Sequence, residues 1–272
     1  LGFGDASVTK VAADGQGRMK PEALKAALAR VPGPVIVCTQ AGDVNTGAFD
    51  PFDQIIAIAK EREGVWVHVD GAFGLWAAAS AKHRHLTAGM QGADSWATDA
   101  HKWLNVPYDC GLAFVRDSAS HRAAMARSAS YLQKSTVDRD NYEWTPEFSR
   151  RARGFASYAA LRQLGRKGVA AMIDRCCSHA RLFAELLGKA PGIKIHNEVV
   201  LNQVLVGFEK PGQENDAWTR EVIARVQRDG TCWLSGTVWH GKALMRISVS
   251  NWSTTEDDVR QSAAAILRAH HS

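Results

Sequence analysis

Residues 65–70 read Val-Trp-Val-His-Val-Asp, and Gly-Ala-Phe-Gly follows at residues 71–74. A short apolar run of this kind is typical of a buried strand, because β-branched and aromatic residues favour an extended backbone. The run ends on the carboxylate of Asp70. Burying a charge at a strand end is costly unless a partner neutralises it, so we expect a cationic partner for Asp70.

Similar runs and helical patterns surround this segment in the first half of the chain. Strands alternating with helices predict an α/β fold with a mostly parallel sheet, covered on both faces. Asp50 is interpreted as a helix N-cap and Pro51 as the first helical residue. The other predicted elements are strands at 35–39, 95–98 and 112–115 and a helical segment from Pro21 to about Arg30.

The pattern changes after Pro146, where a long helical segment runs to Gly188. Shorter elements follow it and indicate a smaller α+β domain joined to the first by the long helix. We therefore predict a large domain at 1–148 and a small domain at 149–272. The predicted elements of the small domain are strands at 193–196, 199–208, 231–235 and 244–248, a helix at 216–228 and a capped helix from Thr254.

Composition excludes several classes of protein. The 272 residues carry a net charge of +5, but the basic residues are scattered, so no nucleic-acid partner is expected. Five cysteines without a CxxC pair indicate reduced thiols in the cytoplasm. No apolar run reaches the roughly 18 residues of a membrane helix. His83 and His85 lack the further ligands of a zinc site, so no metal is expected.

Lys102 lies 102 − 70 = 32 positions after Asp70, behind a strand that should neighbour the Asp70 strand. Ligands of such sheets bind beyond the carboxyl ends of the strands, so both side chains can reach one pocket. Thr98 and His101 accompany the lysine. Pyridoxal phosphate requires this set: an amine, a carboxylate for the ring nitrogen, and phosphate donors. A turn-forming Asp and a solvated Lys are the alternative for each residue alone.

The segments His68-Val69-Asp70-Gly71-Ala72-Phe73 and Asp99-Ala100-His101-Lys102-Trp103 resemble the group II pyridoxal-phosphate-dependent decarboxylases. This family includes the aromatic-amino-acid, histidine and glutamate decarboxylases. The resemblance implies the fold type I architecture, with a large, mostly parallel sheet and a small C-terminal α+β domain. It also implies pyridoxal 5'-phosphate as cofactor and the conversion of an L-amino acid to a primary amine and carbon dioxide.

The resemblance assigns roles by position. Lys102 would hold the cofactor, and Asp70 would pair with its ring nitrogen. Ala72 would pack its small side chain against one face of the ring. His101 would lie near the phosphate and is counted with the catalytic residues, and Thr98 is a second candidate there.

Two further segments match the family. The loop from Gly42 to Gly47 matches one at the cofactor edge, which makes Asn45 a cofactor-binding candidate; a plain Gly-rich connection is the alternative. Tyr131 aligns with the tyrosine of a mobile loop that supplies a proton, and Tyr142 competes with it. A tyrosine that is only packed remains an alternative. By looser analogy with aminotransferases, Arg246 could contact a substrate carboxylate.

The start of the chain departs from the family. Leu1-Gly2-Phe3-Gly4 resembles the residues that follow the ring-stacking histidine in the family's sequences. We therefore expect this chain to be a fragment that contains only the C-terminal part of the enzyme. The missing strands would leave a sheet edge and apolar surface open. A homodimer is implied for the full-length protein. The alternatives are an aminotransferase or aldehyde-forming enzyme of the same fold and a catalytically inert truncated chain. The amino-acid substrate is not determined by the sequence.

Overall fold

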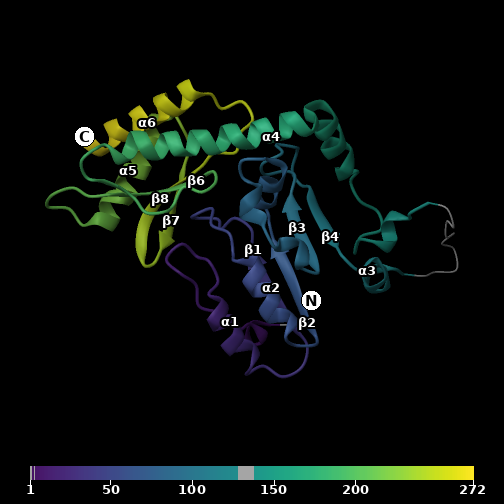
Figure 1. Ribbon diagram of the computed structural model, residues 1–272. Helices are drawn as coiled ribbons and strands as arrows, with labels where there is room; N and C mark the ends of the chain where they lie inside the picture. Colours follow the sequence, from purple (N-terminus) through teal and green to yellow (C-terminus); the bar gives the residue numbers. More distant parts are fainter. Residues whose placement is uncertain (1, 3, 128–137) are drawn as a thin grey trace.

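The computed structural model describes residues 2, 4–127 and 138–272 and contains two four-stranded sheets (Figure 1). The large sheet contains β1 (Val35–Gln40), β2 (Val65–Asp70), β3 (Ser95–Asp99) and β4 (Gly111–Val115). The small sheet contains β5 (Ile193–Ile195), β6 (Gln203–Phe208), β7 (Ser235–Trp239) and β8 (Lys242–Ser248). The α-helices are α1 (Pro21–Leu28), α2 (Phe52–Lys60), α3 (Ser118–Met125), α4 (Arg153–Gly188), α5 (Asn215–Asp229) and α6 (Glu256–His271). Short 3-10 turns are η1 (Asp5–Ser7), η2 (Gly74–Ala79), η3 (Arg84–Thr87), η4 (Met90–Gly92) and η5 (Asn141–Glu143).

The large sheet confirms the predicted α/β architecture. Its strands lie in the order β1-β2-β3-β4; the first three are parallel and β4 is antiparallel to β3. One face carries the buried side chains of Val37, Val67 and Val69, which belong to the same core as Ile55 and Ile56 of α2. The apolar spacing of α2 and the alternation of the strands therefore build one core together.

The opposite face of the large sheet is open in the part of the chain that the structure describes. Ile36 is 58% exposed, and Cys38 and Asp70 are exposed on the same face. Phe114 of the edge strand β4 is 49% exposed as well, although its register with Trp96, and of Trp96 with Val69, places it on the other face. The expectation of helices on both faces is therefore wrong for the described residues, whereas the expected apolar surface is present.

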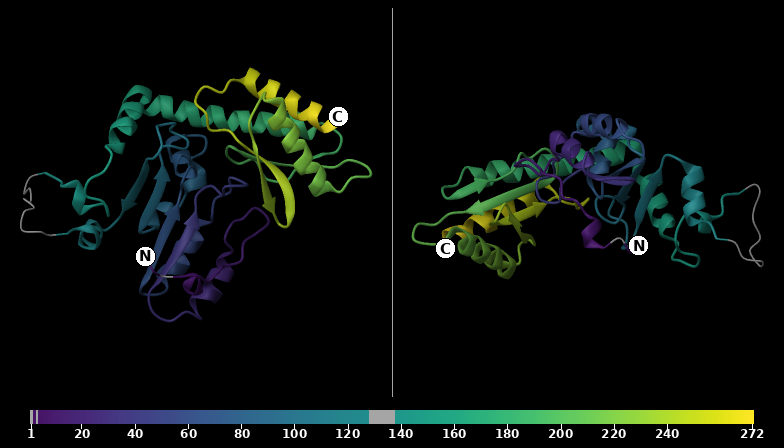
Figure 2. Two further views of the ribbon diagram at one scale, coloured as in Figure 1. Left: turned by 180° about the vertical axis from the view of Figure 1, so that it is seen from behind. Right: turned by 90° about the horizontal axis from the view of Figure 1, so that it is seen from below.

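The small sheet is antiparallel throughout, in the order β5-β6-β8-β7. Every residue of β6 is buried, because this strand lies inside the sheet and packs under α4 and α5. Helix α6 lies against α4 and α5 (Figure 2). Its N-cap is Thr255, one residue after the predicted start, and the Thr255 hydroxyl and the Asp258 carboxylate form a capping box.

Helix α4 connects the two sheets, crossing above both in Figure 1. It contacts η2 on the large-sheet side and β5 and β6 on the other. Its helical path breaks at Gly165, where φ is 60° and ψ is −179°. The helix begins at Arg153, seven residues later than the pattern after Pro146 indicated. None of the helices in the described ranges is long and apolar enough to cross a membrane.

Two local predictions are wrong. Asp50 does not cap α2, which begins at Phe52; its carboxylate instead accepts the backbone N–H groups of Met19 and Gln40, both at 2.7 Å. The strand predicted at 231–235 lies further along, because β7 begins at Ser235. At Asp50 the partners that determine the local structure are distant in sequence, whereas β7 pairs with the neighbouring strand β8.

Candidate active site

The carboxyl ends of β1, β2 and β3 meet at one edge of the large sheet. Asp70 is in register with Ala97 of β3, and the backbone carbonyl of Asp70 accepts the N–H of Ala41, directly after β1. The loops that follow these three strands therefore lie side by side. This is the edge at which open α/β sheets bind ligands.

Asp70 and the lysine segment are joined through Ala72. The Ala72 N–H donates to Asp70 Oδ1 at 3.0 Å, and the Ala72 carbonyl accepts the N–H of Asp99 at 2.8 Å. The hydroxyl of Thr98 lies 3.5 Å from the same carbonyl. The structure thus brings Asp70, Ala72 and Thr98 to the base of the Lys102 loop.

Lys102 forms an ion pair with Asp99. Its Nζ lies 2.8 Å from Asp99 Oδ2, and none of the ion pairs between described residues involves Asp70. Asp70 is exposed, so water solvates its carboxylate and the charge needs no cationic partner. The expectation of a cationic partner assumed that Asp70 is buried, and this assumption is wrong. The Lys102 side chain is 42% exposed and accessible to a ligand.

Asp99 is the site residue that the sequence analysis missed. The same Oδ2 atom that binds Lys102 lies 3.8 Å from Nε2 of His101. The backbone of Asp99 is fixed from two sides, since its carbonyl also accepts the indole N–H of Trp76 at 3.3 Å. The spacing Asp99-x-x-Lys102 could have indicated this ion pair in the sequence, because side chains three positions apart in a turn can lie close enough to pair.

His101 is held by the backbone of Cys110. Its Nδ1 lies 3.1 Å from the Cys110 nitrogen and 3.0 Å from the Cys110 oxygen. The ring of Tyr108 packs on the imidazole with centroids 4.1 Å apart. These contacts orient Nε2 of His101 toward Asp99 and the lysine.

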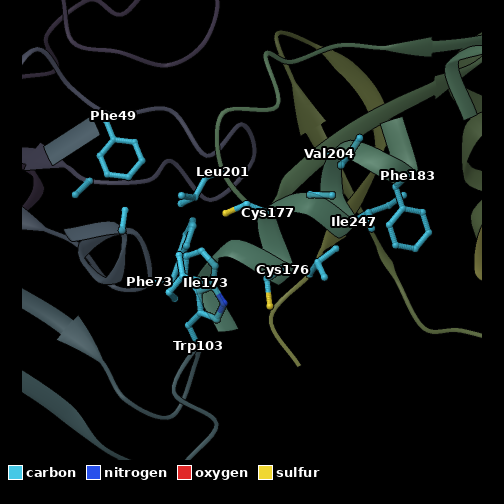
Figure 3. Close-up of a cluster of buried hydrophobic side chains, with 14 of the residues drawn as sticks. Phe49, Phe73, Trp103, Ile173, Cys176, Cys177, Phe183, Leu201, Val204 and Ile247 are labelled. Atoms are coloured by element: carbon cyan, nitrogen blue, oxygen red, sulfur yellow. The ribbon is translucent and has the colours of Figure 1, made fainter. Parts of the chain in front are cut away.

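The residue after the lysine anchors the loop in the core. Trp103 is fully buried and packs against Phe73, which follows the Asp70 turn, with ring centroids 6.4 Å apart. Figure 3 shows Trp103 beside Phe73 and Ile173, the latter from α4. Both site loops are therefore attached to one buried cluster, which limits their relative movement.

The hydrogen bond of the Asn45 side chain is to the small sheet and not to the Lys102 segment. Its Oδ1 accepts the hydroxyl of Thr237 in β7 at 2.8 Å. Nearby, Arg246 donates from Nη1 to the carbonyl of Val44 at 3.0 Å. The loop after β1 thus connects the large sheet with the small one, and Arg246 binds backbone there.

Of the two tyrosine candidates, Tyr131 lies outside the described residues. Tyr142 stacks on Phe148 with centroids 5.5 Å apart, and its hydroxyl is buried. Desolvation raises the pKa of the Tyr142 hydroxyl. No hydrogen bond, ion pair or ring contact between described residues joins Tyr142 to the lysine segment. Nor do the described residues include a group of three or more metal-ligating side chains.

The donor set fits pyridoxal phosphate chemically. An accessible amine, an exposed carboxylate and an imidazole lie on adjoining loops at Lys102, Asp70 and His101. Ala72, whose backbone joins the Asp70 turn to Asp99, carries only a methyl side chain.

Comparison with known proteins agrees with this chemistry. Residues 3–209 match the family model described as the pyridoxal-dependent decarboxylase conserved domain. The chain is 32% identical over 288 aligned positions to L-2,4-diaminobutyrate decarboxylase of Rhizobium meliloti, covering all of this chain and 58% of that protein. It is 35% identical over 204 positions to the acidic amino acid decarboxylase GADL1 of Bos taurus, covering 72% of this chain and 39% of that protein.

Solved structures agree in fold. Mouse CSAD superposes with a TM-score of 0.90 at 26% identity, and Oryza sativa TDC, solved with PLP and tryptamine, with 0.91 at 23% identity. Each covers 99% of this chain, which corresponds to 60% and 58% of those chains. The chain thus spans about three fifths, or less, of these relatives. By its family match, its relatives and its fold, the chain belongs to the pyridoxal-dependent decarboxylase family.

Proposed function

We propose that this chain carries the lysine-bearing part of the active site of an amino-acid decarboxylase that uses pyridoxal phosphate. The observation that carries the proposal is the connection of Asp70 to Lys102 through Ala72 and Asp99 at adjacent strand ends. When bound, pyridoxal phosphate withdraws electrons from the amino-acid Cα, so that the carboxylate can leave as carbon dioxide. The reaction releases a primary amine.

The residues of the chain would divide this work. The Nζ atom of Lys102 would hold the cofactor and release it to the incoming amino acid. The carboxylate of Asp70 would keep a proton on the ring nitrogen, while Ala72 leaves room for the ring. His101, and in second place Thr98, would serve the phosphate.

Other roles are proposed on weaker structural support. Asn45 would border the cofactor from the loop after β1, although its side chain binds Thr237. Reprotonation at Cα would come from Tyr131. The buried hydroxyl of Tyr142 and its raised pKa make Tyr142 the weaker proton donor.

For the whole protein we propose a homodimer acting on an L-amino acid in the cytoplasm. The five cysteines carry free thiols, in keeping with a reducing compartment. The relatives are named for 2,4-diaminobutyrate and for acidic amino acids, so basic and acidic substrates are the first to test. Transamination, aldehyde formation and an inert chain remain the alternative outcomes of that test.

The first experiment asks which lysine binds the cofactor. The purified chain is incubated with pyridoxal phosphate, reduced with borohydride and mapped by peptide mass spectrometry. The label is expected on Lys102, and Lys102→Ala should abolish it. Lys82→Ala, which removes an exposed lysine elsewhere in the large sheet's domain, should leave it unchanged. A label on a different lysine contradicts the assignment.

The second experiment identifies the reaction. Carboxyl-labelled L-2,4-diaminobutyrate, L-aspartate and L-tryptophan are supplied, and released carbon dioxide is measured together with amine, aldehyde and keto-acid products. Carbon dioxide and amine in equal amounts support decarboxylation. A keto acid without carbon dioxide indicates transamination, and aldehyde indicates the third outcome.

A further inference from the structure

The loop that carries Lys102, residues 100–105, is here called the lysine loop, and Asn105 holds its far end. The Asn105 N–H donates to the Lys102 carbonyl at 3.3 Å, and Asn105 Nδ2 donates to the Trp103 carbonyl at 2.5 Å. One residue therefore binds the first two peptide carbonyls after the Lys102 Cα. At the near end, the N–H of Asp99 donates to the Ala72 carbonyl, so the loop is attached on both sides of the lysine.

The same amide binds the segment that follows β8 of the small sheet, residues 250–254, here called the bridge segment. Asn105 Nδ2 also donates to the Ser250 carbonyl at 2.9 Å, and Asn105 Oδ1 accepts the Trp252 N–H at 3.3 Å. An amide has two N–H hydrogens and one accepting oxygen, so these bonds and the bond to Trp103 use both hydrogens and the oxygen. The side chain thus joins the lysine loop to the bridge segment.

The bridge segment is in turn fixed to helix α4. Arg175 Nη2 donates to the Trp252 carbonyl at 2.7 Å, and His179 Nε2 lies 3.1 Å from the Thr254 carbonyl. Arg175 and His179 are four positions apart on α4, so their side chains lie on the same side of the helix. A series of hydrogen bonds therefore connects the lysine loop to the helix that joins the two sheets.

The backbone of Asn105 has a conformation that residues with a side chain rarely adopt. Its φ is 58°, in the left-handed region, and His240 is the other non-glycine residue with positive φ among those that the structure describes. Such a conformation persists where the surrounding contacts hold it, and the three side-chain hydrogen bonds of Asn105 do so. Glycine adopts the same φ without strain, so Asn105→Gly removes the amide and leaves the backbone conformation accessible.

We propose that Asn105 is a positioning residue for Lys102, because its amide fixes the lysine loop relative to the small sheet and α4. This inference deepens the proposed function and rests on it. The Lys102 side chain is partly exposed, so the fold positions its amine chiefly through the backbone of the loop. Without the amide the loop should adopt more positions, and a smaller fraction of them would be competent to bind the cofactor.

The connection is tested without cofactor, by hydrogen exchange of the purified chain followed by peptide mass spectrometry. In Asn105→Gly, exchange should become faster in the bridge segment, because the Trp252 N–H loses its acceptor, and in the lysine loop. His240→Gly, at the other left-handed position, is the matched control and should leave both segments unchanged. Wild-type exchange rates in the bridge segment of Asn105→Gly overturn the inference.

The consequence for Lys102 is tested by titrating pyridoxal phosphate and recording the absorbance of the lysine-bound cofactor, with Lys102→Ala as the blank. Binding should be about tenfold weaker in Asn105→Gly and unchanged in His240→Gly. Arg175→Met removes the donor to the Trp252 carbonyl. It should weaken binding in the wild type and add nothing in Asn105→Gly, because this anchor acts through the amide of Asn105.

The outcomes separate this inference from the function on which it rests. Equal affinities of wild type and Asn105→Gly, or additive effects of Asn105→Gly and Arg175→Met, overturn the inference and leave the proposed function standing. A lower urea midpoint of Asn105→Gly with wild-type affinity shows a role in stability alone and also overturns it. If the wild type binds no cofactor at Lys102, the proposed function fails, whereas hydrogen exchange still decides whether Asn105 fixes the lysine loop.

Discussion

Lys102 illustrates how the sequence can indicate the region in which a side chain lies without indicating the contacts that it makes there. The sequence placed it beside Asp70 because both follow neighbouring strands, and the structure brings the two loops together. The ammonium nevertheless pairs with Asp99, three residues earlier. A nearby acid within one turn costs less chain entropy to reach than an acid across the sheet edge.

The pair between Asp99 and Lys102 should contribute little to folding. Both side chains are partly solvated, so their attraction is screened by water. Asp99→Asn should lower the free energy of unfolding by less than about 1 kcal/mol. Urea denaturation followed by circular dichroism measures this difference. A decrease in unfolding free energy of more than about 2 kcal/mol would show that the ion pair stabilises the fold, contrary to this prediction.

At the scale of elements, Asp50 shows that a residue in a helix-start pattern can instead bind the backbone of other segments. The Asp-Pro pair looks like an N-cap and first helical residue, but the carboxylate joins the strand β1 to the segment before α1. Its two backbone donors, Met19 and Gln40, lie 31 and 10 positions away. No pattern confined to residues 50–60 contains that information.

The variant Asp50→Asn tests this bridge. An amide supplies one accepting oxygen, so one backbone N–H of the pair loses its acceptor and faces another N–H. Because the site is buried, we expect a loss of about 2 kcal/mol in unfolding free energy. Asp53→Asn, in the first turn of α2, is the matched control; its side chain is exposed, and the change should alter stability by less than about 0.5 kcal/mol. If the two variants are equally stable, the bridge has no energetic role.

The break in α4 depends on a backbone conformation available to glycine. At Gly165 φ is 60° and ψ is −179°, a combination that side chains with a Cβ rarely adopt, and no atom lies within 4 Å of a Cβ built there. Gly165→Ala should therefore destabilise the chain by about 1–3 kcal/mol through the backbone alone. Gly154→Ala, in the first turn of α4 with similar open space, should stabilise it slightly. In thermal denaturation, the Tm of Gly165→Ala should fall and the Tm of Gly154→Ala should rise. Changes of Tm in the same direction would contradict the requirement for glycine at position 165.

At the scale of the whole molecule, buried and partly buried histidines link stability to pH. Burial is the largest cause that lowers the pKa of His68, His83, His196 and His270 below 6.5. The unfolded chain therefore binds these protons more tightly than the folded one. The stability they contribute is present above pH 6.5 and is lost as pH falls through the lowered values.

This predicts falling stability between pH 7 and pH 5. Urea midpoints measured in steps across that range should decrease, and His270→Gln should make the decrease shallower. His270 suits the test because it joins Trp218 of α5 to the carbonyl of Pro191, and its protonation removes the acceptor of the Trp218 N–H. A midpoint independent of pH in the wild type would refute the linkage.

The connection between the two sheets was also invisible in the sequence. The loop after β1 reads as a Gly-rich connection at the cofactor edge, yet Asn45 binds Thr237 and the carbonyl of Val44 binds Arg246. These partners lie 192 and 202 positions away. Only the folded chain brings them together.

The sequence by itself determined the order of the strands and helices and the edge of the sheet at which the loops of Asp70 and Lys102 lie, and it supplied the carboxylate and the amine of the proposed site. These follow from local patterns, since period, turn residues and chemical type are properties of short segments. The tertiary structure decided which atoms meet: Lys102 with Asp99, Asp50 with two distant N–H groups, and His68 with Ser95. Such contacts depend on register and on packing between remote segments, where displacements of an ångström determine whether a hydrogen bond forms.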